Sequence, residues 1–215
     1  SDLPGRFGWK AETVSVAEQV AGAFSGDMGL TTTMVEVDDC TEAQQDCIEA
    51  VSGGAPEVEE QIFDRVVLYS QAIAVPVRRD ADSGDVLRGK TLFNELDCGK
   101  CHVSSHVTGD AAIPELEGQL IWPYTDMLLH DMGEGLADGL PVGSASGSEW
   151  RTPPLWGLGL VDDVGGYARF LHDGRARSLE EAILWHGGEA EASKRAYEAL
   201  PERHRSYVLS FLEDL

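Results

Sequence analysis

The chain has few basic residues. Lys and Arg together number 16 against 38 Asp and Glu, which gives a formal net charge of −22 over 215 residues. Phosphate backbones and anionic membrane surfaces would repel such a chain, so nucleic acid is a poor candidate partner, and basic proteins or cations such as Ca²⁺ are better ones. No run of 18 apolar residues occurs, which predicts no membrane span. The first residues, SDLPG, lack the basic and apolar regions of a signal peptide, so either an export signal was removed or the chain is a cut piece.

A cysteine pair followed by a histidine is the clearest motif. Residues 98–102 read CGKCH, the C-x-x-C-H pattern of c-type haem attachment. Two thiols three residues apart on one helical turn can meet the two vinyl groups of one porphyrin, and His102 then places an imidazole under the iron. Half a zinc site would need a second pair of matching spacing, and a redox dithiol would not need the histidine. The motif predicts one covalent haem c on Cys98 and Cys101, with His102 as an axial ligand.

The other two cysteines, Cys40 and Cys47, flank the loop TEAQQD. In a continuous helix their Cα atoms would lie roughly 10 Å apart, beyond the ~7 Å limit for a disulfide, so a bridge requires a bend. Disulfides and covalent haem both belong to oxidising compartments. We therefore expect a structural Cys40–Cys47 bridge, with two unpaired thiols as the alternative.

Hydrophobic spacing and capping residues predict most of the helices. Ser-x-x-Glu capping boxes open expected helices at Ser15 and Ser178, and Pro201 can open a last helix. A long helix is expected over 57–74, and its apolar stripe consists of Val58, Ile62, Val66, Tyr69 and Ile73. Residues 103–177 are rich in Gly and Pro and poor in periodicity, which is typical of a segment that wraps a ligand.

Motif content divides the chain at 85/86. Residues 1–85 are expected to form a helical, loop-rich N-terminal region that holds the disulfide loop. From Val86 the sequence resembles a class I cytochrome c, because a helix with Gly89 and Phe93 leads into CGKCH. In such domains the first and last helices cross at a glycine. The expected fold class is all-α, with a class I cytochrome c-like haem domain at 86–215.

The second axial ligand decides the chemistry, because iron with one protein ligand is open and reactive, whereas iron with two mainly transfers electrons. His106 lies too close to His102 in sequence, and His204 has a charged setting typical of a solvated surface. His186 ends the apolar face of the helix from Leu179, just before two glycines. From this pattern alone, a histidine that merely hydrogen-bonds its neighbours fits equally well. The further candidates are His130, His172, Met127 and Met132.

Longer motifs resemble known haem proteins. The motifs that resemble bacterial di-haem cytochrome c peroxidases and the di-haem enzyme of methylamine utilisation are WRTPPLW (150–156), FLHDGRA (170–176) and SLEEAI (178–183). Those that more closely resemble the bacterial di-haem oxidoreductase family, often labelled thiol oxidoreductases, are GRFGWK (5–10), GDMGL (26–30) and PYTDMLLHDMG (123–133). The resemblance implies an all-α fold with cytochrome c-like haem domains in the periplasm.

The resemblance also implies a missing part. Family members carry two C-x-x-C-H strings and this sequence has one, so we expect an upstream haem domain that is absent from this chain. In the peroxidases, peroxide reacts at the N-terminal haem and the C-terminal haem passes electrons to it, which implies the electron-transfer portion here. The expected partners are that haem domain and a redox protein. With the motif cysteines consumed in thioethers, Cys40 and Cys47 are the thiols left for any dithiol chemistry.

The resemblance sharpens the choice of distal ligand. In the peroxidases the helix after the His-Asp-Gly motif carries the distal methionine, and aligning residues 179–183 puts His186 at that place. The next candidates for the distal ligand are Met132 and then Met127. His172 is expected to be structural or to support a ligand. His130 has three open roles: it forms a supporting pair with Asp131, faces the missing domain, or belongs to a buried structural pair.

Three functions remain open at this point. The first is an electron-transfer haem domain of a periplasmic di-haem oxidoreductase, and the second is a peroxidase-like enzyme with an open haem. The third is a structural or cation-binding domain. The related peroxidases bind Ca²⁺ between their haem domains, and the acidic segments 36–39 and 162–163 are candidates here, although neither matches an EF-hand loop.

Overall fold

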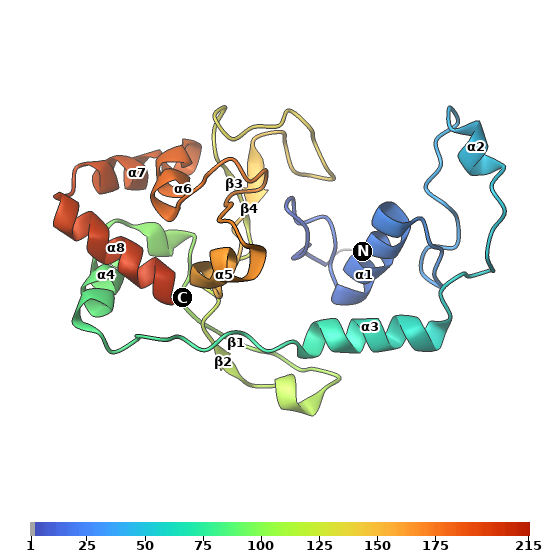
Figure 1. Cartoon of the computed structure of the whole chain (residues 1–215), viewed down its shortest axis with the longest axis horizontal. Helices are drawn as coiled ribbons and strands as arrows, with labels where there is room; N and C mark the ends of the chain where they lie inside the picture. Colours follow the sequence, from blue (N-terminus) through green and yellow to red (C-terminus); the bar gives the residue numbers. More distant parts are fainter. Residues whose placement is uncertain (1–2) are drawn as a thin grey trace. The chain divides into compact units, whose positions relative to one another are not determined.

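The computed structural model describes residues 3–215 (Figure 1), and the chain divides into two compact units, Ser1–Ala74 and Val75–Leu215. Most of the regular structure in the described residues is helical, accompanied by four short strands. Among the described helices, none combines the length and apolar character that crossing a bilayer requires.

The first unit contains α1 (Val16–Met28), α2 (Gln45–Ile48) and α3 (Glu60–Ala72). The predicted cap at Ser15 is confirmed, because the Glu18 amide donates to its hydroxyl oxygen at 3.1 Å. Helices α1 and α3 pack together through Phe24 and Phe63, whose ring centroids are 6.5 Å apart. The small core of this unit is completed by buried Ala21 and Val58.

Helix α3 buries a different face from the one its sequence pattern indicates. Phe63 is buried, whereas Ile62, Tyr69 and Ile73 of the predicted stripe are exposed. Val58 is buried but precedes the helix. The prediction of the stripe as a core face is therefore wrong, because one large aromatic side chain docks on α1 and sets the rotation of the helix.

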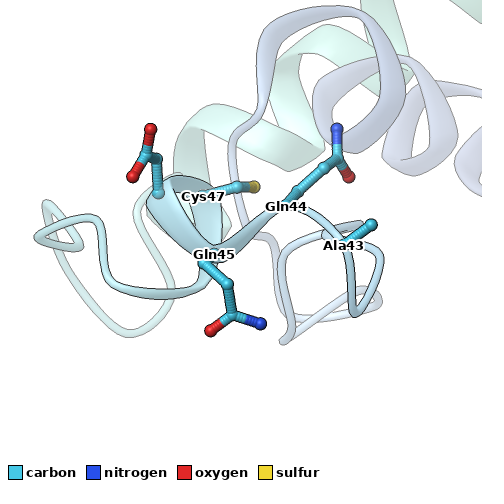
Figure 2. Close-up of a pocket in the computed structure, with 5 residues that line it drawn as sticks. Ala43, Gln44, Gln45 and Cys47 are labelled. Carbon is cyan, nitrogen blue, oxygen red and sulfur yellow. The ribbon is translucent and has the colours of Figure 1, made fainter.

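A disulfide joins Cys40 and Cys47, whose Cα atoms are 5.8 Å apart. The predicted bend is present, because a turn precedes the single helical turn of α2 and the two cysteines do not share one helix. Figure 2 shows this loop, with an open hollow lined by residues 43–47. The bridge thus closes a short exposed loop that has little core of its own.

Replacing Cys40 and Cys47 together by Ser is expected to destabilise the chain by ~2–3 kcal/mol on the loop-length model, because the unfolded loop regains its freedom. Thermal unfolding followed by circular dichroism measures this change, and chemical reduction of the wild type should reproduce it. An unchanged melting temperature would contradict a structural role. Loss of redox turnover with unchanged folding would instead indicate a dithiol role.

The core of the second unit forms where α4 (Gly84–Glu95) crosses α8 (Glu202–Asp214). Pro201 stands at the N-terminus of α8, as predicted, and the predicted apolar stripe of that helix is buried: it consists of Tyr207, Val208, Phe211 and Leu212. A Cβ atom on Gly89 would lie only 1.9 Å from the carbonyl oxygen of Tyr207. The predicted close approach of these two helices at Gly89 is confirmed.

Gly89→Val is expected to destabilise the chain by ~3 kcal/mol or more, because the new side chain meets backbone rather than a movable side chain. Chemical denaturation measures the loss. Gly165→Ala is the matched control, since a Cβ atom there meets nothing within 4 Å. Equal stabilities of Gly89→Val and the wild type would contradict the helix crossing.

Short elements lie between α4 and α8, and they include strands that the all-α expectation did not contain. The strands pair antiparallel in two small sheets: β1 (His106–Val107) with β2 (Leu120–Ile121), and β3 (Leu129–Asp131) with β4 (Glu149–Arg151). The helices are α5 (Val161–Gly165), α6 (Leu179–Trp185) and α7 (Glu191–Glu198), and the 3-10 turns are η1 (Cys98–Lys100), η2 (Pro114–Leu116), η3 (Leu158–Leu160) and η4 (Gly188–Ala190). The chain is mostly helical, and its strands are too short to leave a two-residue periodicity in the sequence.

The segment before α4, residues 75–83, belongs to the second unit. Arg78 donates from its Nε to buried Asp214 at 2.6 Å, and the Asp80 amide donates to the same carboxylate at 2.6 Å. The units therefore separate between Ala74 and Val75, whereas the motif content indicates a change at 85/86. Within the second unit, residues 75–83 form a strap that ties the start of α4 to the end of α8.

Candidate functional site

The C-x-x-C-H motif occupies a tight turn directly after α4. Helix α4 ends at Glu95, Asp97 adopts a left-handed conformation with φ of 63°, and η1 then begins at Cys98. The His102 amide donates to the Cys98 carbonyl at 3.0 Å, which closes the turn. Cys98 and Cys101 are both unpaired thiols. The turn thus gathers the two thiols and the imidazole at one place.

Both thiols of the motif are held in the protonated form at neutral pH. Burial raises the pKa of Cys98 to about 11. Burial, assisted by the negative charges of Asp126 and Glu189, also raises the pKa of Cys101. A catalytic redox dithiol needs a thiolate of lowered pKa. The electrostatics of this pair are therefore the opposite of those in a thioredoxin-like site.

His102 is a neutral imidazole with one fixed tautomer. Its Nδ1 lies 3.0 Å from the Tyr124 carbonyl oxygen, and since a carbonyl can only accept, Nδ1 carries the proton. Burial, with a smaller contribution from His186, lowers the pKa of His102 to about 4 against the opposing effect of the hydrogen bond to Tyr124. Phe93 packs beside the ring with centroids 6.1 Å apart. This leaves Nε2, which carries a lone pair, as the atom that can bind a metal.

His186 repeats this arrangement at the end of α6. The predicted cap at Ser178 is confirmed, because the Glu181 amide donates to its hydroxyl at 3.0 Å, and His186 directly follows the last helical residue. Its Nδ1 donates to the Ala182 carbonyl at 2.8 Å. Burial lowers the pKa of His186, with a smaller contribution from the charge of Lys194. His186 is therefore also neutral with a free Nε2 lone pair.

Protonation of His186 would oppose protonation of His102 and so adds to the lowering of the His102 pKa. Each imidazole donates Nδ1–H to a backbone carbonyl, the usual orienting contact of metal-bound histidine. Two neutral imidazoles and two protonated thiols are a donor set that suits a c-type haem. The residues present therefore fit such a group.

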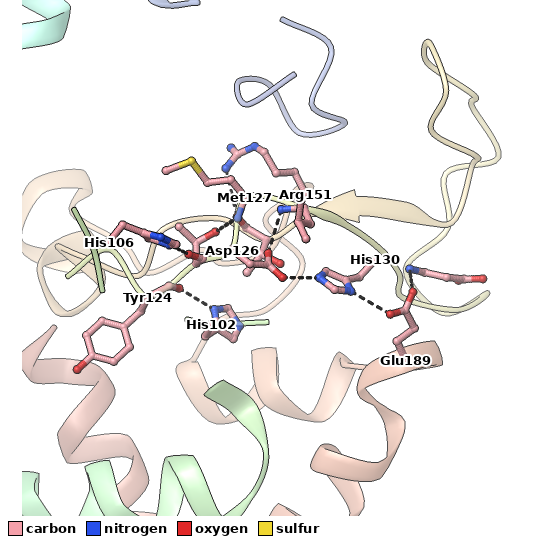
Figure 3. A network of polar contacts seen from close by, with 12 residues as sticks. His102, His106, Tyr124, Asp126, Met127, His130, Arg151 and Glu189 are labelled. Carbon is pink, nitrogen blue, oxygen red and sulfur yellow. Dashed lines mark hydrogen bonds and ion pairs between the residues drawn. The ribbon is translucent and has the colours of Figure 1, made fainter. Parts of the chain in front are cut away.

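A second cluster, which we call the His130 clamp, consists of Asp126, His130 and Glu189 (Figure 3). His130 Nε2 lies 2.8 Å from an Asp126 carboxylate oxygen, and Nδ1 lies 2.9 Å from a Glu189 carboxylate oxygen. The other oxygen of Glu189 accepts from the Asp131 amide at 2.9 Å. One histidine thus bridges two carboxylates that lie 63 positions apart in the sequence.

The hydrogen bonds within the clamp favour a protonated His130 and an ionised Glu189. Burial lowers the pKa of His130, but hydrogen bonds to Glu189 and Asp126 outweigh it and leave the pKa above its ordinary value. The hydrogen bond from His130 in turn lowers the pKa of Glu189. Both ring nitrogens of His130 can therefore carry protons and donate to the two carboxylates.

The Cys101 sulfur, an Asp126 oxygen and a His130 nitrogen lie within 4.8 Å of one another, and they form the single three-donor group of this kind in residues 3–215. Both nitrogens of His130 are already engaged by carboxylates. The acidic segments 36–39 and 162–163 supply no such group within the described chain.

The other sequence candidates have their own partners. His106 Nε2 donates to the Thr125 carbonyl at 2.7 Å, and His204 is exposed. His172 stacks on Trp150, with ring centroids 3.6 Å apart and planes 11° apart. Met127 and Met132 are both half-buried, and the Met132 amide donates to Ser148.

The sequence did not indicate three residues that contact the histidines of the site. Tyr124 contacts His102, and Asp126 and Glu189 contact His130. Tyr124 and Asp126 belong to the motif PYTDMLLHDMG, which marked the segment without indicating their roles. Tyr124 acts through its backbone carbonyl, so its side chain carries no signal for the contact. Glu189 is an ordinary exposed glutamate in sequence terms, and its role depends on the fold.

The sequence model of the family described as "Di-haem oxidoreductase, putative peroxidase" matches residues 3–215. A solved structure described as Kuenenia stuttgartiensis hydrazine synthase pressurized with xenon is 19% identical at a TM-score of 0.48, and the match covers 73% of this chain and 56% of that chain. The chain therefore spans little more than half of that structure's chain. No curated protein sequence matches significantly. Since the family match extends over nearly the whole sequence, the chain belongs to the di-haem oxidoreductase family.

Proposed function

We propose that this chain is the electron-transfer portion of a periplasmic di-haem oxidoreductase, and that it carries one covalent, bis-histidine haem c. Cys98 and Cys101 would form the thioethers, and His102 and His186 would be the axial ligands. A bound haem c would supply a one-electron iron couple.

The neutral pair of histidines carries the proposal. Each ring has its Nδ1 proton engaged by a carbonyl, at 3.0 Å for His102 and 2.8 Å for His186, so each presents only Nε2 to a metal. Their lowered pKa values keep both lone pairs available at neutral pH. With both positions of the iron filled by protein, electron transfer is favoured over reaction with peroxide.

The surroundings of His102 suit an electron-transfer site. Phe93, Tyr124 and Phe211 pack in edge-to-face contacts with centroids 5.3 to 6.1 Å apart, and all three are buried. Phe93 of this cluster also packs beside the His102 imidazole. The crossing of α4 and α8 at Gly89, next to this cluster, supports a class I cytochrome c-like domain over 86–215, preceded by the helical region 1–85.

Periplasmic location is part of the proposal, and the same chemistry supports it. The Cys40–Cys47 disulfide fits an oxidising compartment, where covalent haem attachment also takes place. The proposed partners are an upstream haem domain of the same protein and a redox protein, for which the net charge of −22 favours a basic surface. Calcium is not part of the proposal, because neither acidic segment gathers three donors among the residues described.

A peroxidase-like enzyme with an open haem is the second candidate, since the family description itself contains the word peroxidase. In that case one of the two histidines would not bind the iron at rest. Coordination by both His102 and His186, as proposed above, would leave no open position on the iron and therefore argues against this enzyme.

Redox titration and ligand binding separate the two candidates. The purified chain is expected to show a single one-electron transition, and its ferrous form should bind carbon monoxide slowly or not at all. Rapid binding of carbon monoxide, together with fast oxidation of the ferrous form by peroxide, would instead favour the enzyme with an open haem.

A further inference from the structure

The segments that carry the two proposed ligands are joined by hydrogen bonds. On the first side, the backbone of residues 124–126 is attached to the motif turn. The Asp126 amide donates to the Cys101 carbonyl at 2.8 Å, and the Thr125 amide donates to the Val103 carbonyl at 3.0 Å. Together with the bond from His102 to Tyr124, these contacts fix Asp126 relative to the proximal ligand.

On the second side, Glu189 lies three residues after His186, within the turn η4. The backbone here approaches β3 closely, because a Cβ atom on Gly188 would lie 2.2 Å from the Asp131 carbonyl oxygen. Glu189 strengthens this contact by accepting from the Asp131 amide and from His130. The turn after His186 is therefore attached to β3.

His130 connects the two sides. Its side chain is 16% exposed and Asp126 is 12% exposed, so this half of the clamp is largely shielded from solvent, whereas Glu189 is 55% exposed. Charge-assisted hydrogen bonds shielded in this way hold their geometry better than surface ion pairs do. The path from Cys101 through Asp126, His130 and Glu189 ends at the turn that follows His186.

We propose that His130 is a positioning residue, which holds the turn after His186 against the motif segment and so keeps the distal imidazole on the iron. This inference rests on the proposed function, since it concerns the same pair of ligands. It assigns to His130, Asp126 and Glu189 a role in setting how readily the distal ligand dissociates.

Glu189→Gln in the haem-loaded full chain is the sharpest test. The substitution keeps the size of the side chain and an oxygen that can accept from Asp131, but it removes the carboxylate that His130 contacts. Cyanide binding to the ferric protein requires the distal ligand to leave. We expect this rate to rise roughly 10-fold, in the range found when partners of metal-bound residues are removed. Amide hydrogen exchange at residues 187–190 should also become faster.

Glu191→Gln is the matched control. It removes the same charge two residues away, where the carboxylate pairs with Lys194 and Arg195 and not with the clamp. This variant should bind cyanide at the wild-type rate. His130→Gln should match Glu189→Gln, and the double variant should show little further change, because both substitutions break one connection.

Two results would overturn the inference. One is an unchanged cyanide rate in Glu189→Gln, even if the melting temperature falls, because that indicates a merely structural contact. The other is an equal rise in Glu191→Gln, which indicates a general effect of charge. Failure of the proposed function is visible separately, since the wild type itself would then lack a six-coordinate spectrum.

Discussion

The double variant Cys98→Ser, Cys101→Ser is expected to lose all covalently bound haem. Both thiols lie on the turn closed by the His102 amide, and both are protonated and unpaired. No other unpaired thiol is found in the described residues, so no substitute attachment point exists. Because thioethers resist acid–acetone extraction and denaturing electrophoresis, haem staining of the gel measures attachment directly.

The matched control for this experiment is Cys40→Ser, Cys47→Ser, which removes two cysteines without touching the motif. It should retain the full haem stain at a lowered stability. Covalent haem in the Cys98, Cys101 double variant would contradict the motif assignment, as would a wild type that gives up its haem to acid–acetone.

His186→Ala is expected to convert the iron from six-coordinate to five-coordinate and to open it to cyanide and carbon monoxide. The imidazole follows α6 and its Nδ1 is engaged by the Ala182 carbonyl, which leaves Nε2 for the iron. A histidine that only capped the helix would leave the spectrum unchanged when removed. Stopped-flow binding of carbon monoxide to the reduced variant measures the opening.

His186→Met tests the same position by a change of ligand. A thioether stabilises ferrous iron more than an imidazole does, so the reduction potential should rise towards that of a His/Met cytochrome. Spectroelectrochemical titration measures this potential. A potential equal to that of the wild type would contradict coordination by residue 186.

Met132→Ala and His172→Ala are the controls for the ligand assignment. His172 stacks on Trp150, and Met132 lies next to the Asp131–Glu189 contact, so both changes alter the surroundings without removing a proposed ligand. Both variants should remain six-coordinate. Loss of coordination in Met132→Ala with retention in His186→Ala would transfer the distal role to Met132.

Local signals predicted the parts of the fold that depend on local chemistry. Ser15, Ser178 and Pro201 begin helices because caps act within one turn, and the structure confirms all three. The crossing at Gly89 was predictable from the resemblance to class I cytochromes c, and the structure shows that a side chain there would meet the backbone of Tyr207. The C-x-x-C-H string required no fold to be recognised.

The buried face of α3 and the short strands depend on tertiary packing, so local sequence patterns could not predict them. The stripe of α3 has helical spacing, yet Phe63 outside that stripe faces the core. Strands of two or three residues are held by their partners and by the bonds around them, so β1 to β4 leave no periodic signal.

The candidate site shows the same division. His186 could be singled out from its place at a helix end, together with the family resemblance. The partners of the site could not, because the Tyr124 carbonyl has no side-chain signature and Glu189 meets His130 only after 59 residues of chain have folded back. The role proposed for His130 therefore rests on contacts that form only in the folded chain.

The most direct test of the central claim is the absorption and magnetic circular dichroism spectrum of the ferric full chain. Two histidine ligands predict low-spin six-coordinate iron without the ~695 nm band of methionine-ligated haem, and with a near-infrared band typical of bis-imidazole coordination. High-spin iron, or the ~695 nm band, would contradict the assignment of His102 and His186 as the two axial ligands.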